Sequence, residues 1–177
     1  MTMQNRNPRA RLTRWMTGVL AAAVVIAAAE ARAGEEKAVG EANVQFYAAL
    51  NAMFTGDVSG MKQIWSHADD VTYMGPGGGF QVGWEQVWAT WETQAALKLG
   101  GKIKPDEMRV TVGGDLAFVN CYELGNNLDA QGQPQHVSIR ATNLFRKENG
   151  EWKMIGHHTD LLPYLEKQPL TTPAESD

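Results

Sequence analysis

Apolar residues in the second half of this chain alternate with polar ones at a spacing of two. Met108, Val110 and Val112 alternate with Arg109 and Thr111, and similar patterns predict three further strands over residues 116–124, 137–147 and 152–159. The connections are short and turn-like, so we expect the four strands to be consecutive antiparallel neighbours. A strongly twisted sheet of this kind curls, and helices must cover its concave side.

The preceding residues carry apolar side chains at helical spacing. Three helices are expected, over residues 35–54, 58–66 and 84–99, with a short hairpin of strands, 71–74 and 80–82, between the last two. The predicted fold class is therefore α+β, a cone-shaped, curved antiparallel sheet wrapped around three N-terminal helices. The open end of such a cone leaves a cavity between the sheet and the long helix, which is the default place for a ligand.

The first 33 residues have the composition of an export signal. Arginines at positions 6, 9, 11 and 14 precede an apolar run from Met16 to Ala29, and Ala31-Arg32-Ala33 has the small-x-small pattern of a cleavage site. We expect residues 1–33 to be a cleaved signal peptide and the protein to be periplasmic or secreted. The alternative is a membrane anchor, for which the run is short, because a spanning helix needs about 20 apolar residues. The expected domain covers residues 34–167, and a disordered tail follows over residues 168–177.

Removal of the signal peptide makes the chain strongly acidic. It takes away five arginines and one glutamate, which leaves 144 residues with 11 Lys and Arg, 19 Asp and Glu, and a net charge of −8. An acidic chain without a basic cluster argues against nucleic acid and anionic membranes as partners. The single cysteine, Cys121, cannot form an internal disulfide, and its apolar surroundings indicate a small core residue.

His158 and Asp160 are the first candidates for chemistry. Their two-residue spacing on a strand puts both side chains on one face, and a solvated Lys153 places Trp152, Met154, His158 and Asp160 on the inner face of the cone. An imidazole held by a carboxylate can move protons near neutral pH. Two alternatives stay open: both residues contact a ligand, or they only bond backbone groups at the end of the strand.

Aromatic and amide side chains are expected on the wall of the cavity. Trp84, Trp88 and Trp91 lie on one face of the third helix, and Trp91 is expected to point furthest inward. The polar residues expected on the wall are Tyr47, Tyr73, Asn120, Tyr122 and Asn143. Strand parity places Arg140 on the outer face, as a surface or interface residue, unless a bulge turns it inward to anchor an anion.

Neither a metal nor a cofactor is predicted. His157 and His158 point to opposite faces of a regular strand, and no third ligand has convincing spacing. The stretch Gly75-Pro76-Gly77-Gly78-Gly79 lacks the following helix and the Lys-Ser/Thr pair of a phosphate-binding loop. It is expected to form a mobile rim at the mouth of the cavity.

The order of several short motifs resembles the nuclear transport factor 2-like superfamily, and within it the SnoaL-like and ketosteroid-isomerase-like proteins. The motifs are Phe46-Tyr47-Ala48-Ala49-Leu50, Gly56-Asp57 followed by Ile64-Trp65, Asp69-Asp70-Val71-Thr72-Tyr73, Arg140-Ala141-Thr142-Asn143, Gly150-Glu151-Trp152-Lys153 and His157-His158-Thr159-Asp160. The closing hairpin also resembles the association domain of the calmodulin-dependent kinase. The resemblance implies a cone that usually forms a homodimer through the outer face of its sheet. It does not imply one activity, because this fold carries isomerases, dehydratases, polyketide cyclases and members that only bind or assemble.

One position departs from the ketosteroid isomerases. Those enzymes carry a proton-shuttling aspartate just before the proline that follows the first strand, and the matching residue here is Gly75, before Pro76. Tyr47 matches the oxyanion-binding tyrosine only imperfectly, since it lies two residues too far from Gly56-Asp57. Steroid isomerisation by the usual residues is therefore not expected.

Three hypotheses for the function follow. The leading one is an exported domain that binds a small molecule in an aromatic-lined cavity, with a polar end formed by His158 and Asp160. The first alternative is an acid–base lyase, isomerase or cyclase that uses the same two residues. The second is an oligomeric assembly module without catalysis, with a filled cone and an outer apolar patch that includes Val119 and Ile155.

Overall fold

In the computed structural model of this chain, residues 8–166 are described. Contacts divide the chain into two units, residues 1–35 and 36–177, and the site discussed below belongs to the second unit. No helix among the described residues has a stretch long and apolar enough to cross a membrane. The tail predicted over residues 168–177 lies outside the described residues.

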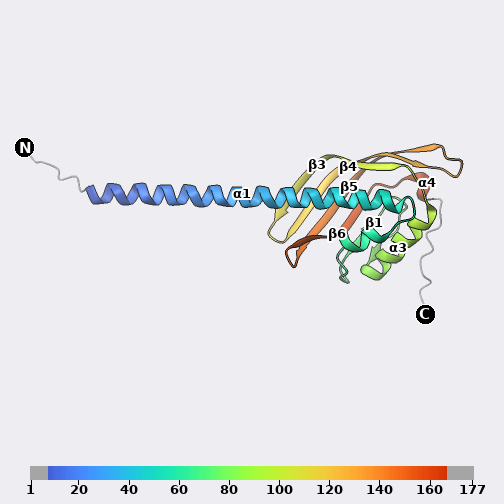
Figure 1. The fold of residues 1–177 in the computed structure, drawn as a ribbon, viewed down its shortest axis with the longest axis horizontal. Coiled ribbons are helices and arrows are strands. Elements are labelled where there is room, and N and C mark those ends of the chain that lie inside the picture. The colour runs from blue at the N-terminus through green and yellow to red at the C-terminus, as the bar shows by residue number, and fades with distance from the viewer. Residues whose placement is uncertain (1–7, 167–177) are drawn as a thin grey trace, which may run out of the picture. The chain divides into compact units, whose positions relative to one another are not determined.

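Helices come first in the chain and long strands follow (Figure 1). The elements are α1 (Pro8–Met53), α2 (Ser59–Ile64), β1 (Thr72–Met74), β2 (Gln81–Val82), α3 (Trp84–Leu97), β3 (Lys102–Gly113), β4 (Leu116–Leu128), β5 (Pro134–Glu148), β6 (Glu151–Thr159) and α4 (Pro163–Glu166). The predicted α+β class and the curved antiparallel sheet of long strands are confirmed. Helix α1 begins further upstream than the predicted first helix, and the short α4 was not predicted.

The sheet has six strands in the order β2-β1-β6-β5-β4-β3. Strands β3 to β6 are antiparallel neighbours, as their short connections predict. The β1–β2 hairpin extends the sheet beside β6, where β1 and β6 run parallel and Tyr73 pairs with His157. The end of α1, α3 and α4 gather at one end of the sheet (Figure 1).

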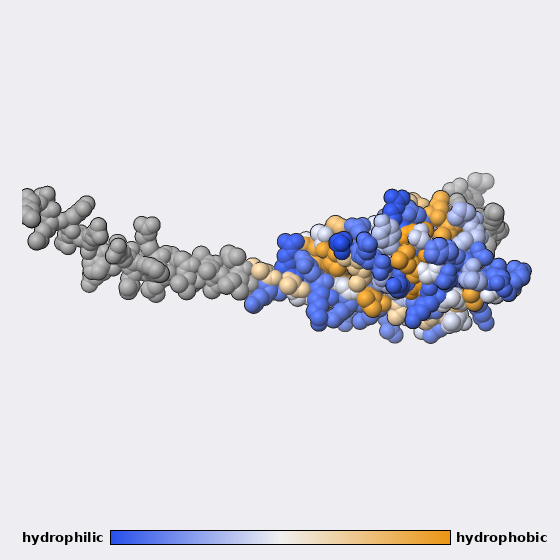
Figure 2. Space-filling model, turned by 90° about the horizontal axis from the view of Figure 1, so that it is seen from above, coloured by the Kyte–Doolittle hydropathy of each residue, from blue (hydrophilic) through white to orange (hydrophobic). Residues whose placement is uncertain are grey.

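The core lies between α1 and the inner face of the sheet, meaning the face toward α1. Helix α1 buries Val39, Phe46, Leu50 and Met53 at three-, four- and seven-residue steps. Inward residues on β4 are Ala117, Val119, Cys121 and Glu123, and those on β5 are Val137, Ile139, Ala141, Asn143 and Phe145. Some large hydrophobic residues remain at the surface, and Figure 2 shows one face on which such residues lie in strips among hydrophilic ones.

Strand β6 contains one extra residue. Phe145 of β5 pairs with Met154 and Leu144 pairs with Gly156, so Ile155 has no partner in the register. A bulge of this kind reverses the orientation of every following residue relative to regular alternation. Met154 is buried as expected, but the next inward histidine is His157, which is 2 % exposed, and His158 turns to the outer face.

Asn51 ties the long helix to the edge of the sheet. Its Nδ2 donates to the Ile103 carbonyl at 2.8 Å, and its Oδ1 accepts from the Ile103 N–H at 2.8 Å. The side-chain amide therefore pairs with β3 as the backbone of a neighbouring strand would.

Replacing Asn51 by alanine should lower the free energy of unfolding by about 2 kcal/mol, because two partly buried backbone groups of Ile103 lose their partners. Urea unfolding followed by circular dichroism measures the change. The matched control is Asn126→Ala, at an exposed position of β4, where a change of about 0.5 kcal/mol or less is expected. Equal effects of the two substitutions would contradict the structural role of Asn51.

Candidate functional site

A cavity of about 30 Å³ lies inside the cone, at the end where α1, α3 and α4 meet. Its volume is enough for a single water molecule. The residues that line it are Leu50, Phe54, Tyr73, Pro76, Trp91, Gln94, Leu99, Ile103, Glu123, Asn127, Val137, His157, Leu162 and Leu165. The wall is therefore aromatic and aliphatic, with a small number of polar groups set into it.

The tautomer of His157 follows from its hydrogen bonds. Nδ2 of Asn143 donates to Oδ1 of Asn43 at 2.7 Å, which orients the Asn143 amide. The Asn143 oxygen then accepts from Nδ1–H of His157 at 2.5 Å, so Nε2 keeps its lone pair. Burial, together with a smaller electrostatic contribution from His158, lowers the pKa of His157 to about 3. The imidazole is neutral at physiological pH.

Glu123 supplies the acidic partner. Its side chain is buried on the inner face of β4, and the O–H of Tyr47 donates to its Oε1 at 3.0 Å. Burial raises the pKa of Glu123 to about 7, although the bond from Tyr47 opposes the rise. Oε1 of Glu123 lies 3.7 Å from Nε2 of His157. A carboxyl group that titrates near neutral pH therefore stands beside an imidazole nitrogen that keeps its lone pair and can accept a hydrogen bond.

Tyr73 completes the polar side of the cavity. Its phenol oxygen accepts from Nε2 of Gln94 at 2.7 Å, and its ring stacks on His157 with centroids 5.7 Å apart. Burial raises the pKa of Tyr73 well above its usual value. A side chain on Gly75 would overlap the Tyr73 phenol. The phenol thus fills the room next to the position where ketosteroid isomerases carry their aspartate, which explains the glycine here.

The residues predicted for the pocket lie in three places. Tyr73 and Trp91 line the cavity, and Tyr47 and Asn143 lie one layer behind it, bonded to Glu123 and His157. Asn120 and Tyr122 lie on the outer face instead, because the alternation on β4 turns Val119, Cys121 and Glu123 inward. Their expected place on the pocket wall is a wrong prediction.

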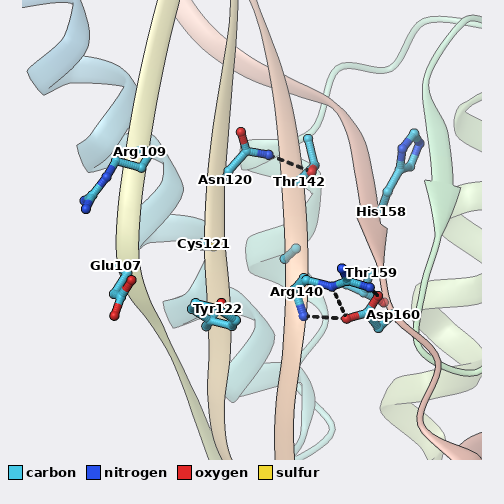
Figure 3. A pocket seen from close by; sticks show the side chains of 11 residues that line it. Glu107, Arg109, Asn120, Cys121, Tyr122, Arg140, Thr142, His158, Thr159 and Asp160 are labelled. Atoms are coloured by element: carbon cyan, nitrogen blue, oxygen red, sulfur yellow. Dashed lines mark hydrogen bonds and ion pairs between the residues drawn. The ribbon is translucent and has the colours of Figure 1, made fainter.

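His158 and Asp160 also lie on the outer face, so their expected inward orientation is wrong, and the bulge at Ile155 is the reason. Figure 3 shows them at an open depression of about 540 Å³ that crosses β3 to β6. Asp160 is paired with Arg140, whose Nε and Nη2 donate to its two oxygens at 2.8 Å each. These bonds lower the pKa of Asp160 to about 2. His158 contacts Thr72, with Nε2 3.4 Å from Oγ1.

Sequence reasoning missed Glu123 and His157. A signal for Glu123 was present, since it lies two residues from Cys121, which the sequence assigns to the core, and therefore shares its face. No local signal marks the bulge that turns His157 inward. Within residues 8–166, no group of three His, Cys, Asp or Glu side chains is placed to hold a metal ion.

Glu123→Gln should remove a pH-dependent loss of stability. The folded pKa is raised from 4.5 to about 7, so the contribution of Glu123 is fully present below pH 4.5 and is lost as the pH rises through about 7. A shift of this size corresponds to a stability change on the order of 3 kcal/mol. Urea unfolding is followed by tryptophan fluorescence at pH values from about 4 to about 8. Over this range, the free energy of unfolding of the variant should rise by that amount relative to that of the wild type.

His157 changes the free energy of unfolding with pH in the opposite direction. Its lowered pKa makes stability fall as the pH drops below 6.5. The variant keeps His157, so this slope cancels in the comparison. The control is Glu92→Gln, at an exposed position of α3, whose difference from the wild type should stay within about 0.5 kcal/mol across the range. A constant difference between Glu123→Gln and the wild type would contradict the assignment.

Comparison with solved structures gives three informative neighbours. A candidate dehydratase of the NTF2-like family from Streptomyces avermitilis is 27% identical, with a TM-score of 0.64, and the match covers 73% of this chain and 96% of that one. A candidate calcium/calmodulin-dependent protein kinase type II association domain from Thiobacillus denitrificans is 25% identical, with a TM-score of 0.56, covering 68% and 92%. A candidate ketosteroid isomerase from Shewanella frigidimarina is 22% identical, with a TM-score of 0.56, covering 70% and 94%, and shows likeness of fold alone.

Among curated protein sequences, none matches this chain. A family model for the SnoaL-like domain matches residues 39–162, which is most of the chain and includes Glu123, His157 and the residues bonded to them. By this match and by its fold, the chain belongs to the SnoaL-like domain family, within the NTF2-like proteins.

Proposed function

We propose that this domain binds a small organic molecule in its inner cavity, with the polar group of the ligand against Glu123 and His157. The observation that carries the proposal is the position of this pair. Burying an ionisable carboxyl with one hydrogen bond opposes folding, and perturbed acid–base pairs that face a cavity are typical of functional sites. The rings of Tyr73 and Trp91 line the cavity, with Phe46 packed against Trp91, and this aromatic wall suits the apolar body of such a ligand.

A ligand larger than water needs the cavity to widen. The segment Leu161–Leu165 closes one side of it, since Leu162 and Leu165 line the cavity. Among the described residues, two hydrogen bonds join this segment to the rest of the domain. The Leu162 N–H donates to the Pro76 carbonyl at 2.8 Å, and the Tyr164 O–H donates to Oδ1 of Asn127 at 3.0 Å. Outward movement of this segment is the access route that we propose.

Filling the cavity should abolish ligand retention. Leu99→Trp places an indole at the cavity wall, whereas Leu97→Trp adds the same ring at a residue that is 40% exposed on α3. Native mass spectrometry of gently purified protein should find an organic adduct on the wild type and on Leu97→Trp, and none on Leu99→Trp. An adduct retained equally by both variants would place the ligand elsewhere. A wild type that neither carries an adduct nor gains thermal stability from any neutral organic compound would contradict binding.

A second candidate function is acid–base catalysis at the same pair. The pKa of Glu123, about 7, suits a reaction in which its carboxylate takes a proton from carbon and the resulting carboxyl group protonates a departing hydroxyl. Nε2 of His157, 3.7 Å from Oε1 of Glu123, can accept a hydrogen bond from the substrate. The likeness to a candidate dehydratase favours this class of elimination over others. Turnover that vanishes in Glu123→Gln while ligand retention persists would support catalysis. A wild type that retains the ligand without turnover would support the binding function and contradict catalysis.

We propose further that residues 1–33 direct export and are then removed, so that the mature protein is periplasmic or secreted. N-terminal sequencing of the protein recovered from the exported fraction tests this. A mature chain beginning at Gly34 is the expected result, and an intact N-terminus would contradict it.

Two copies are proposed to pair through the outer face of the sheet. Leu116, Phe118 and Tyr122 expose 55%, 39% and 43% of their surface there, which is unusual for a row of large side chains on one strand. Glu107 and Arg109 line the same face, and opposite charges side by side suit a two-fold contact between identical surfaces. The assembly-only alternative expected Val119 on this face, but Val119 is buried inside.

Phe118→Glu should convert the dimer to a monomer, because it buries an unpaired charge in the proposed apolar contact of each copy. Sedimentation velocity measures the mass in solution. Phe80→Glu is the control, since Phe80 is 60% exposed beside β2 and outside the proposed contact, and it should leave the dimer intact. A monomeric wild type would overturn the proposal.

A further inference from the structure

Four buried polar side chains form a line from α1 across the sheet to the inner cavity. Nδ2 of Asn143 donates to Oδ1 of Asn43, and Oδ1 of Asn143 accepts from Nδ1–H of His157. Oε1 of Glu123 lies 3.7 Å from Nε2, on the other side of the imidazole. The four side chains are each 4% exposed or less. A change in one of them must therefore be answered by its neighbours rather than by water.

The same line is satisfied in a second arrangement, with donors and acceptors exchanged. A side-chain amide has a donor end and an acceptor end of nearly the same shape. When both amides turn over, Nδ2 of Asn143 donates to Nδ1 of His157, and Nδ2 of Asn43 donates to Oδ1 of Asn143. The imidazole proton is then on Nε2, on the side of Glu123.

The exchange loses two weak contacts. Nδ2 of Asn43 donates to Sδ of Met108 at 3.3 Å, and Nδ2 of Asn143 donates to the phenol oxygen of Tyr47 at 3.3 Å. Sulfur is a weak acceptor, and the second bond is long. The bond from Tyr47 to Glu123 is the same in both arrangements. These two contacts favour the arrangement with Nδ1–H while Glu123 is neutral.

The charge on Glu123 reverses this preference. An ionised carboxylate faces the lone pair of Nε2 in the first arrangement, whereas Nε2–H donates to it in the second, and a bond to a charged acceptor is the stronger kind. Burial raises the pKa of Glu123 to about 7, so both charge states occur near neutral pH. His157 stays neutral throughout, because burial, with a smaller contribution from His158 on the outer face, lowers its pKa to about 3.

The other groups around Glu123 also keep their charge state near neutral pH. Tyr47 on α1, Tyr73 on β1 and Cys121 on β4 face it, and burial raises the pKa of each. Its partners in the register on β3 and β5 are not titratable, and the residues that α3 adds to the cavity lining carry no charge. Within the described part of this site, ionisation near neutral pH is therefore that of Glu123.

We propose that His157 is a pH-dependent switch, whose proton moves from Nδ1 to Nε2 as Asn143 and Asn43 turn over when Glu123 ionises. The net change releases one proton from Glu123 to solvent and leaves the imidazole neutral. On the acidic side, Nε2 offers a hydrogen-bond acceptor to the cavity, and on the alkaline side that nitrogen donates to Glu123. The switch itself needs no ligand, and its consequence for binding rests on the proposed function.

NMR of the ligand-free full chain tests the switch. Long-range proton–nitrogen correlation spectra distinguish a ring nitrogen that carries a proton from one that keeps a lone pair. The ring of His157 is assigned by its contacts with the rings of Phe46 and Tyr73. At least about nine-tenths of the molecules should carry Nδ1–H at about pH 5.5, and a similar fraction Nε2–H at about pH 8.5. The midpoint should coincide with the titration of the Glu123 carboxyl carbon.

Two variants assign the transition to Glu123. Glu123→Gln cannot ionise, so its His157 should hold a single tautomer from about pH 5.5 to about pH 8.5. Glu92→Gln changes an exposed residue of α3 and should keep the wild-type transition. The titration of the wild type decides the proposal even where Glu123→Gln does not fold.

Several results would overturn the switch. One is a His157 that keeps Nδ1–H through the titration of Glu123, and another is a Glu123 that does not titrate in this range. A His157 that becomes cationic, or a transition that persists in Glu123→Gln, would overturn it as well. None of these results bears on adduct retention in Leu99→Trp, so the binding function is tested separately.

Discussion

The unpaired residue Ile155 in β6 determines which side chains meet inside the cone. Because Ile155 has no partner on β5, the residues after it face the side opposite to the one that regular alternation gives them. His157 consequently meets Asn143, whose amide is oriented by Asn43 of α1. Nδ1 of the imidazole then donates to Asn143, and Nε2 keeps its lone pair. The chemical character of the cavity thus depends on a backbone irregularity that contributes no functional group of its own.

Burial shifts the pKa values of Glu123 and His157 in opposite directions. It raises the pKa of Glu123 and lowers that of His157, so the folded pair holds one proton, on the carboxyl group. Between about pH 4.5 and 6.5 the unfolded chain also holds one proton on these two residues, but on the imidazole. Folding therefore moves a proton from base to acid without changing the number bound, and the pair makes stability independent of pH across that window.

Tyr73 shows how the sheet edge and the cavity are connected. The β1–β2 hairpin pairs parallel with β6 and aligns Tyr73 with His157, so a short strand early in the chain supplies the ring that stacks on a histidine near its end. The phenol occupies the space beside Gly75. A polar group is therefore present near the position of the ketosteroid isomerase aspartate, but it is a weak acid buried among aromatic rings, and its oxygen accepts a hydrogen bond from Gln94.

The sequence by itself determined the order of elements, the antiparallel meander and the inward face of β5, because helical spacing, two-residue alternation and short turns are local properties. It also indicated that Tyr73 and Trp91 point inward. Only the tertiary structure decided that His157 rather than His158 enters the cavity, since alternation predicts orientation only until one residue is inserted, and cross-strand pairing sets where that happens. The protonation of Glu123 is likewise tertiary, because it depends on how completely α1 and the sheet exclude water from one carboxyl group.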